Sequence, residues 1–396
     1  MKDKIKFEEQ LNYVGKEYKM HGKIRVKQIF GGHQIYQEIV NFPPKGVEYL
    51  GVSEGTREGK YYESKKFKEK LGAMLQKLKI PRIMIIKPGD YDLIHSSRGI
   101  IPIQLWNKKP WVIDMEHVHS FFGLNPSLIK NKFLKRFIEK KLASKYCRGV
   151  LCHCEATRQA FFHYLDCSKF KDKIKVIYPS SHIIPLKKNK HKKIWILSIL
   201  SDFYGKAGPQ VLKVFSKIEK KYSNVEFWIR ADIPEDLKKK FKLKNVKYMN
   251  YFEDIIPRED LVKSVYSECD IFFYPTLTDS FGYSLIDAMV AKMPIVGSNL
   301  YAVPEMVKDG ETGLVVKIPG YHLEKDYVQS FPLENMEGEV EEKFIEDCYN
   351  ALVKLIEKKS LREKMGEKGF ERISNGDLSI SARNKQLGII YREALK

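Results

Sequence analysis

The sequence predicts an α/β protein made of two successive Rossmann-like domains, each with a parallel sheet. Three observations support this fold class: a length of 396 residues, short apolar runs that alternate with amphipathic helical patterns, and a lysine-rich break between two such series. A chain of this length is too long for one ordinary hydrophobic core. Strands that alternate with helices favour parallel sheets with helices on both faces.

The first series forms the expected N-terminal domain, residues 1–183. Its clearest helical pattern covers residues 127–145, where apolar residues recur at spacings of three and four. The short apolar runs expected as strands are residues 23–30, 82–86, 93–95, 111–114, 150–152 and 175–177.

A break at residues 186–193 contains five lysines and no acidic residue, which is typical of an exposed linker. The alternation then restarts and predicts a second domain, residues 184–377. Residues 319–338 lack periodicity and are expected to form a loop or insertion. Residues 378–396 form one more amphipathic helix, expected to pack back on the first domain. The expected strands are residues 194–199, 225–229, 246–249, 271–274 and 295–296, with helices at residues 209–221 and between the last two strands.

The composition excludes several protein classes. The hydrophobic share of 43% and aromatic share of 12% are globular values, so general disorder is excluded. No apolar run approaches the roughly 20 residues that span a bilayer, and the N-terminus lacks the pattern of a secretory signal. A cytoplasmic protein is therefore expected. Six cysteines make no disulfide framework. The spacing of Cys152 and Cys154 around a histidine does not fit zinc, so no metal is expected.

The net charge of +20 needs a separate explanation. Phosphate-bearing substrates, an anionic membrane and nucleic acid are all compatible partners, but a lysine-rich composition alone explains the charge equally well. The segment from Ser127 to Arg148 has eight lysines and arginines against one acid, along with an apolar stripe. This pattern fits either a membrane-surface helix or an ordinary helix that covers a sheet.

The pattern that carries chemistry begins at residue 270. A buried strand is followed by turn residues and then by a helix, so free backbone N–H groups gather at the positive end of the helix dipole and suit a diphosphate. Asp279 precedes this helix and Asp287 lies inside it, so both could line one crevice. Carboxylates there can accept hydrogen bonds from sugar or ribose hydroxyls. For these residues alone, a simple helix cap and a solvated Asp287 would explain the pattern better.

The residues that follow change this balance, because they complete an ordered series of motifs. Two acids separated by seven residues bracket a Phe-Gly helix start, followed by a strand after a proline, a Pro-Glu corner and a Gly-x-Thr-Gly strand. This order resembles the retaining glycosyltransferases of family 4, which have the GT-B fold of two Rossmann-like domains with parallel sheets facing a central cleft. The matching residues are Asp279, Phe281, Gly282, Asp287, Pro294, Pro304, Glu305, Gly310, Thr312 and Gly313.

The resemblance extends more weakly to the rest of the chain. Gly32 falls at the family's first glycine-rich loop, and His117 at the place of a histidine that faces the sugar. Lys206 falls in the opening of the donor domain, where a basic residue neutralises the diphosphate.

The resemblance implies an enzyme of the hexosyltransferase type (EC 2.4). It would move a sugar from a UDP- or GDP-sugar donor to a glycan, lipid-linked or small-molecule acceptor, with retention of configuration and without a metal or other cofactor. His117 and Asp279 would act at the sugar. A lipid-linked acceptor would fit peripheral contact with the inner face of an anionic membrane through the segment from Ser127 to Arg148. No nucleic-acid partner is expected. The residues implied in donor binding are Gly32, Lys206, Arg230, Ser280, Phe281, Gly282, Tyr283, Ser284 and Asp287.

The sequence also departs from the family pattern. Both acids of the motif are usually Glu, and here each is Asp, shorter by one methylene. A misplacement of about 1 Å can cost on the order of a hundredfold in rate, so the carboxylate contacts must be arranged differently. The arginine usual before Lys206 is missing, and Arg230 could replace it. Lys292 replaces a usual glycine. These departures leave the identity of the sugar open.

Three alternatives remain open. A nucleotide-sugar epimerase on the same architecture would share the diphosphate site, although the Thr312-Gly313 context suits it less well. A nucleic-acid-binding protein would explain the charge, but the sequence has no aromatic-basic or recognition-helix motif. A relative without catalytic activity would explain the two Asp residues and the missing arginine. The sugar, base and acceptor are not encoded in any motif.

Overall fold

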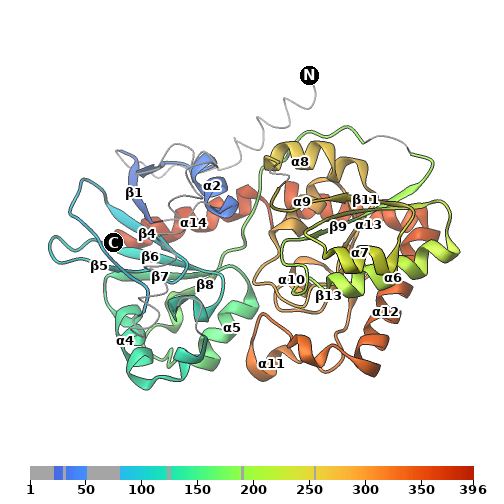
Figure 1. The fold of residues 1–396 in the computed structure, drawn as a ribbon. Coiled ribbons are helices and arrows are strands. Elements are labelled where there is room, and N and C mark those ends of the chain that lie inside the picture. The colour runs from blue at the N-terminus through green and yellow to red at the C-terminus, as the bar shows by residue number, and fades with distance from the viewer. Residues whose placement is uncertain (1–21, 30–32, 51–80, 123–125, 189–190, 254–255) are drawn as a thin grey trace. The chain divides into compact units, whose positions relative to one another are not determined.

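The computed structural model describes residues 22–29, 33–50, 81–122, 126–188, 191–253 and 256–396. The chain forms two compact units, which are described separately (Figure 1). Unit 1 comprises residues 1–180 and 377–396, and unit 2 comprises residues 181–376. The chain therefore passes between the units twice, after Ser180 and after Gly376.

The described residues of unit 1 contain a six-stranded sheet whose strands are all parallel. Its order is β2-β1-β4-β6-β7-β8, formed by β1 (Ile24–Ile29), β2 (Val47–Leu50), β4 (Leu93–Ser97), β6 (Trp111–Met115), β7 (Cys147–Cys152) and β8 (Ile174–Val176). The predicted strand at residues 82–86 forms as β3 (Ile83–Ile85), but it pairs with β5 (Ile101–Ile103) in a separate small sheet. All three β3 residues are exposed, so its apolar run does not mark a strand of the main sheet.

Helices flank this sheet. The predicted helix at residues 127–145 is interrupted at Asn131, whose side chain accepts hydrogen bonds from the amides of Phe133 and Leu134 and caps a new helix. The helical segments are α2 (Gln34–Asn41), η1 (Val118–Phe122), η2 (Pro126–Lys130), α4 (Lys132–Ala143), α5 (Glu155–Tyr164), η3 (Lys171–Lys173) and α14 (Ile380–Ala394).

The C-terminal helix α14 packs on unit 1. Leu387 and Tyr391 are buried in one cluster with residues of the central strands, among them Val26 and Leu93. The Tyr391 hydroxyl lies 2.6 Å from Nδ1 of His95 on β4. The helix therefore completes the core of unit 1 from a distant part of the sequence.

The described residues of unit 2 also contain a six-stranded parallel sheet, with the order β11-β10-β9-β12-β13-β14. From β9 the chain adds β10 and β11 on one side, and then β12, β13 and β14 on the other side of β9. The strand order therefore reverses between β9 and β12. In such open sheets, ligands bind beyond the carboxyl ends of the strands where the order reverses. The strands are β9 (Ile194–Leu200), β10 (Val225–Ala231), β11 (Val246–Met249), β12 (Ile271–Tyr274), β13 (Ile295–Ser298) and β14 (Gly313–Val316). Together the two sheets confirm the predicted α/β fold class.

The helices of unit 2 pack in pairs, α6 with α12 and α9 with α13. Residues 319–338, expected as a loop, contain only short helical turns. The segments are α6 (Gly208–Lys221), α7 (Glu235–Phe241), α8 (Arg258–Ser264), η4 (Tyr266–Glu268), α9 (Tyr283–Val290), α10 (Val303–Met306), α11 (Leu323–Asp326), η5 (Leu333–Asn335), α12 (Gly338–Glu357) and α13 (Lys359–Ser374).

Two glycines of the motif series have structural reasons. A Cβ on Gly313 would lie 2.1 Å from the carbonyl oxygen of Ile295, because β13 and β14 approach closely there. Gly282 has φ +79 at the start of α9, a conformation that L side chains rarely adopt. Gly313 thus allows the close approach at the amino end of β14, while Gly282 shapes the loop at the carboxyl end of the sheet.

The cysteines give no sign of a disulfide, since all six are free and buried. Burial raises the pKa of the Cys147 thiol to about 12. In the part of the chain that the structure describes, no group of three or more His, Cys, Asp or Glu side chains could hold a metal. Within that same part, every helix is too short or too polar to cross a membrane.

Candidate functional site

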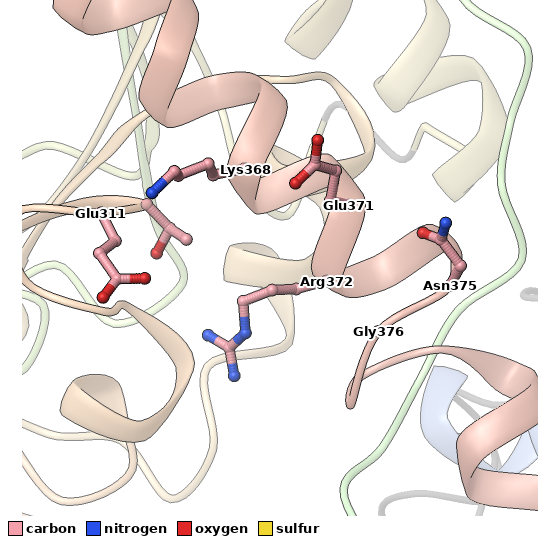
Figure 2. A pocket seen from close by; sticks show the side chains of 7 residues that line it. Glu311, Lys368, Glu371, Arg372, Asn375 and Gly376 are labelled. Carbon is pink, nitrogen blue, oxygen red and sulfur yellow. The ribbon is translucent and has the colours of Figure 1, made fainter.

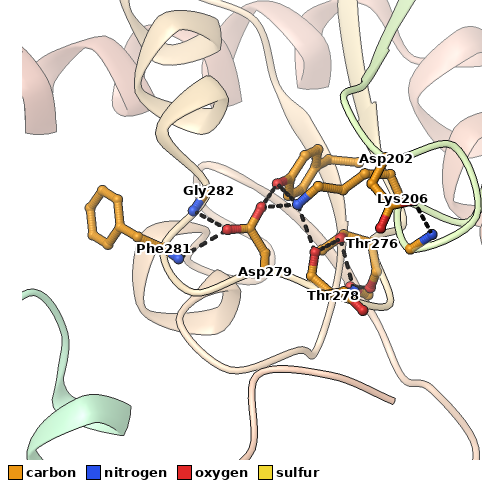
Figure 3. Close-up of polar contacts among 10 residues, drawn as sticks. Asp202, Lys206, Thr276, Thr278, Asp279, Phe281 and Gly282 are labelled. Carbon is orange, nitrogen blue, oxygen red and sulfur yellow. Dashed lines mark hydrogen bonds and ion pairs between the residues drawn. The ribbon is translucent and has the colours of Figure 1, made fainter. Parts of the chain in front are cut away.

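The loops after β9 and β12 meet where the strand order of unit 2 reverses. After β9, the carbonyl of Asp202 accepts from the amide of Lys206 at 2.8 Å, and its carboxylate accepts from the amide of Gly205 at 3.2 Å. Ala207 follows in the left-handed region and begins α6. This tight turn directs the Lys206 side chain towards the loop after β12, and Figure 3 shows the contacts that result.

The ammonium group of Lys206 has three acceptors in that loop. It donates to the carbonyl of Thr278 at 2.6 Å and to the hydroxyl of Tyr274 at 3.1 Å, and it forms an ion pair with the Asp279 carboxylate. The Lys206 and Asp279 side chains are 11% and 15% exposed. Because an ammonium has three N–H donors, these contacts match its full donor capacity.

The carboxylate of Asp279 turns back on its own loop. Oδ1 accepts from the amides of Phe281 at 3.0 Å and Gly282 at 2.8 Å, while Oδ2 contacts Lys206 and the Tyr274 hydroxyl. The prediction assigned the Phe281 and Gly282 amides to a diphosphate, but here they donate to Asp279. A short Asp side chain at this place can reach the two amides that follow it, which accounts for the difference.

Neighbouring segments hold this loop in place. The amide of Leu277 donates to the Gly205 carbonyl at 2.9 Å, which joins the two loops directly. The amide of Asp279 donates to the carbonyl of Gln329, also at 2.9 Å. Residues 319–338, which the sequence predicts only as a loop or insertion, therefore contact the loop after β12 and help to hold Asp279 in place.

The predicted donor-binding residues of the α9 region have different environments. The Phe281 side chain is buried in the core, so only its backbone could face a ligand. Ser280 is half-buried in the loop, and Tyr283 and Ser284 are half-buried in the first turn of α9. The N-cap residue of α9 is Gly282, which has no side chain, and its amide donates to the Asp279 carboxylate. The amides that follow lie at the positive end of the helix dipole.

Asp287, the second acid of the motif, is buried and paired. Arg258 at the start of α8 donates from Nε at 2.8 Å and from Nη2 at 2.6 Å, both to Oδ1 of Asp287. Nη2 also donates to Oγ of Ser181 at 2.5 Å. The sequence indicates Asp287 as a ligand for hydroxyls but does not point to Arg258. An arginine directly after Pro257, where a helix begins near the carboxyl edge of the sheet, is the only signal the sequence offers.

Arg230 lies at the carboxyl end of β10, as predicted, with its side chain buried. Its guanidinium stacks on the Tyr251 ring at 4.7 Å and donates to the Tyr251 carbonyl at 3.3 Å. Tyr266 lies among the same charges. Burial first, and then the Asp287 carboxylate, raise its pKa, while Arg258 and Arg230 oppose the rise. Arg230, Arg258 and Asp287 therefore all lie near the Tyr266 side chain.

His117 lies in unit 1, between β6 and η1, and is half-buried. Burial lowers its pKa. Its ring centroid is 6.1 Å from that of His119, whose pKa burial lowers to about 4. Gly32, the other predicted site residue of this unit, lies outside the described residues.

The carboxyl ends of β4, β6 and β7 in unit 1 carry a buried polar network that the sequence did not predict. The Asp114 carboxylate contacts Nε2 of His153, lies 3.5 Å from the Tyr36 hydroxyl, and is 3.8 Å from Nε2 of His95. Burial lowers the pKa of His95 to about 4. For His153 burial acts in the same direction, but the charge and hydrogen bond of Asp114 together outweigh it and raise the pKa. One carboxylate, Asp114, therefore lies beside two histidines whose pKa values shift in opposite directions.

A separate cavity of about 480 Å³ lies between α13 and the loop before β14. Figure 2 shows its mixed lining, which carries both acidic and basic side chains. Arg372 in its wall donates to the carbonyls of Glu305 and Met306 and so ties α13 to α10. None of the predicted site residues lines this cavity.

Comparison with known proteins agrees with the geometry of unit 2. Residues 193–322 match the family model of the glycosyl transferases group 1. The matched segment begins at β9, ends beyond β14 and includes Lys206, Arg258, Asp279 and Asp287. The match therefore lies within unit 2 and spans the point where its strand order reverses.

Two curated relatives extend over a larger share of the chain. An uncharacterized 41.2 kDa protein in the cps region of Klebsiella pneumoniae is 25% identical over 257 residues, which cover 59% of this chain and 67% of that protein. The trehalose synthase of Thermococcus litoralis is 22% identical over 316 residues, which cover 72% of this chain and 65% of that enzyme. The chain thus spans about two thirds of the length of each of these relatives.

Among solved structures, HepE of Anabaena in complex with UDP superposes with a TM-score of 0.60 at 13% identity. The likeness covers 93% of this chain and 99% of HepE. Such a distant likeness establishes the fold, so the chain has the GT-B fold of two Rossmann-like domains. The chain thus combines the GT-B fold with a segment that matches the family model of the glycosyl transferases group 1.

Proposed function

We propose that this protein is a glycosyltransferase that moves a sugar from a nucleotide-diphosphate donor, a UDP- or GDP-sugar, to an acceptor with retention of anomeric configuration. The observation that carries the proposal is the Lys206 and Asp279 pair beside the N-terminal end of α9, inside the segment that matches the family model. HepE, which shares the fold, was crystallised with UDP, and this adds support for a uridine nucleotide.

The proposed chemistry rests on electrostatics. A leaving diphosphate would approach the N-terminal amides of α9 at Tyr283 and Ser284, where the helix dipole favours an anion. Lys206 would exchange part of its contact with Asp279 for a phosphate oxygen, so its charge would stabilise the leaving group as negative charge develops. Arg230 would add a second positive charge in place of the family arginine that the sequence lacks.

The roles of the remaining residues follow from the same proposal. Asp287 would accept hydrogen bonds from ribose hydroxyls, and His117 would contact the donor sugar as a neutral imidazole, because its pKa is lowered. We propose transfer without a metal or other cofactor. Addition of EDTA should then leave the transfer rate unchanged.

The decisive experiment measures binding and turnover together. Purified protein is titrated with UDP, GDP and their common sugar conjugates by calorimetry, and the same series is run on Asp287→Ala and on the surface variant Lys263→Gln as a matched control. We expect one nucleotide to bind, Asp287→Ala to weaken it by about tenfold or more, and Lys263→Gln to behave as the parent. Product anomers read by NMR then test retention. Failure of every nucleotide to bind, or salt-dependent binding to random DNA in its place, would sink the proposal.

The acceptor is proposed to be a glycan or a lipid-linked molecule at an anionic membrane surface. The support comes from α4, where Phe133 is 86% exposed beside the exposed cations Lys132 and Arg136. An aromatic side chain pointing to solvent among basic residues suits the interface of an anionic bilayer. A helix whose only role was to cover the sheet would not require the Phe133 side chain to be exposed to solvent.

Vesicle sedimentation tests this surface separately from catalysis. We expect binding to vesicles of phosphatidylglycerol and phosphatidylcholine, weaker binding at higher salt, and a loss of several-fold in Phe133→Ser. Phe252→Ser in unit 2, which removes another exposed aromatic side chain, serves as the matched control. Equal binding of the parent and Phe133→Ser would contradict the membrane-binding role of α4. It would leave the proposed donor site unaffected.

A further inference from the structure

Arg258 connects two parts of unit 2 that the sequence keeps apart. Its guanidinium makes two hydrogen bonds to Oδ1 of Asp287 and one to the hydroxyl of Ser181. The Arg258 and Asp287 side chains are 12% and 8% exposed, so the pair is largely removed from water. The guanidinium also lies 5.6 Å from the ring centroid of Tyr283, in the first turn of α9.

The burial gives this contact its strength. A buried carboxylate is tolerated when a partner neutralises it and hydrogen bonds fix it, and loss of one partner leaves an uncompensated charge. Because both Arg258 donors converge on one oxygen, they fix the rotation of the Asp287 carboxylate. Lysine cannot reproduce this, since it lacks the rigid fork of the guanidinium.

Ser181 is the residue at which unit 2 begins. The residues that follow Ser181 and Arg258 make a second contact between the same two segments. Nε2 of His182 lies 3.5 Å from the Glu259 carboxylate. The first turn of α8 therefore holds two consecutive residues at the start of unit 2, and one of these contacts shares its guanidinium with Asp287.

We propose that Arg258 is a positioning residue that orients Asp287 for the nucleotide and transmits occupancy of the site to Ser181. The inference rests on the proposed function, since it needs a nucleotide whose ribose hydroxyls donate to Asp287. Those hydroxyls would donate to the same carboxylate beside Arg258 and draw its guanidinium with them, since an ionised Asp has lone pairs for several donors. A shift of the guanidinium changes its hydrogen bond to Ser181, so nucleotide binding alters the exchange of amides at the start of unit 2.

The binding arm of the test uses UDP and GDP as probes with the full chain. Arg258→Gln is expected to weaken the nucleotide that binds by about tenfold or more. Arg258→Lys should restore part of the loss, and Lys263→Gln on the same helix should match the parent. Circular dichroism confirms that each variant is folded, and Arg258→Lys carries the test if Arg258→Gln is not. Parent-like affinity in Arg258→Gln would overturn the positioning role.

The second arm measures hydrogen exchange of residues 181–186 with and without nucleotide. In the parent, nucleotide should change the exchange rate there. In Ser181→Ala, affinity should stay within about twofold while the nucleotide-dependent change disappears. An exchange rate that nucleotide does not alter in the parent would overturn the connection to Ser181. If the parent binds neither nucleotide, the proposed function itself fails, which is distinct from binding that persists without Arg258.

Discussion

Lys206 and Asp279 form an ion pair across the point where the strand order of unit 2 reverses. Lys206 comes from the loop after β9 and Asp279 from the loop after β12, the two strands between which that reversal falls. The pair joins the two loops at the place where open α/β sheets bind ligands. Each partner satisfies the other in this structure, so a bound diphosphate would have to share Lys206 with Asp279.

Replacement of Lys206 tests the electrostatic role. Lys206→Met removes the positive charge that pairs with Asp279, and the proposed mechanism needs that charge on the leaving group. We expect turnover to fall by about 10²- to 10³-fold, the usual cost of one group that stabilises developing charge. The control is Lys213→Met, which removes a surface lysine from α6 that pairs with Glu341 at 2.6 Å. Steady-state kinetics with the nucleotide sugar identified by calorimetry measure the effect, and a change under tenfold would contradict it.

Asp279→Glu separates two roles for the first acid of the motif. The structure has this carboxylate accepting from the amides of Phe281 and Gly282, a contact that a longer side chain cannot keep in the same register. We therefore expect Asp279→Glu to lower kcat/KM by about tenfold to a hundredfold, since displacement by about 1 Å is costly. Asp279→Asn, which keeps the amide contacts and loses the charge, is the paired variant. Higher activity in Asp279→Glu would mean that the carboxylate holds the sugar directly.

Gly313→Ala tests the reason for the last glycine of the motif series. The added methyl would meet the Ile295 carbonyl oxygen at 2.1 Å, so β13 and β14 must separate. We expect a loss of about 2 kcal/mol or more in the free energy of unfolding in urea, within the range of overpacked sites. Gly310→Ala is the matched control, because it has open space and only the strain of φ +74, which costs about 1 kcal/mol. Equal losses in the two variants would remove the steric explanation.

The sequence allowed the fold class to be predicted, because periodicity and motif order are local signals. It named Lys206 and Asp279 as separate site residues and did not indicate that they pair. It could not supply Arg258, which meets Asp287 across 29 residues without a pattern to mark the contact. Nor could it settle whether Asp279 turns to a ligand or to its own amides, since that depends on one methylene and on the loop path. The predicted strand at residues 82–86 forms in a separate two-stranded sheet. Its apolar run could predict a strand but not the strand with which it pairs.

The buried network of unit 1 predicts a pH dependence of stability. Burial lowers the pKa of His95 from 6.5 to about 4, so the unfolded chain binds a proton there in the range where the folded chain does not. Stability from this group is therefore present above about pH 6.5 and is lost as pH falls towards 4, by about 3 kcal/mol over the whole window. His95→Gln keeps a side chain that can bond to the Tyr391 hydroxyl but does not titrate. Urea unfolding of both proteins between pH 7 and 5 should show a smaller loss in the variant, and parallel curves would contradict the assignment. His153 cannot produce the same trend, because its raised pKa gives stability that is present below about pH 6.5 and lost as pH rises.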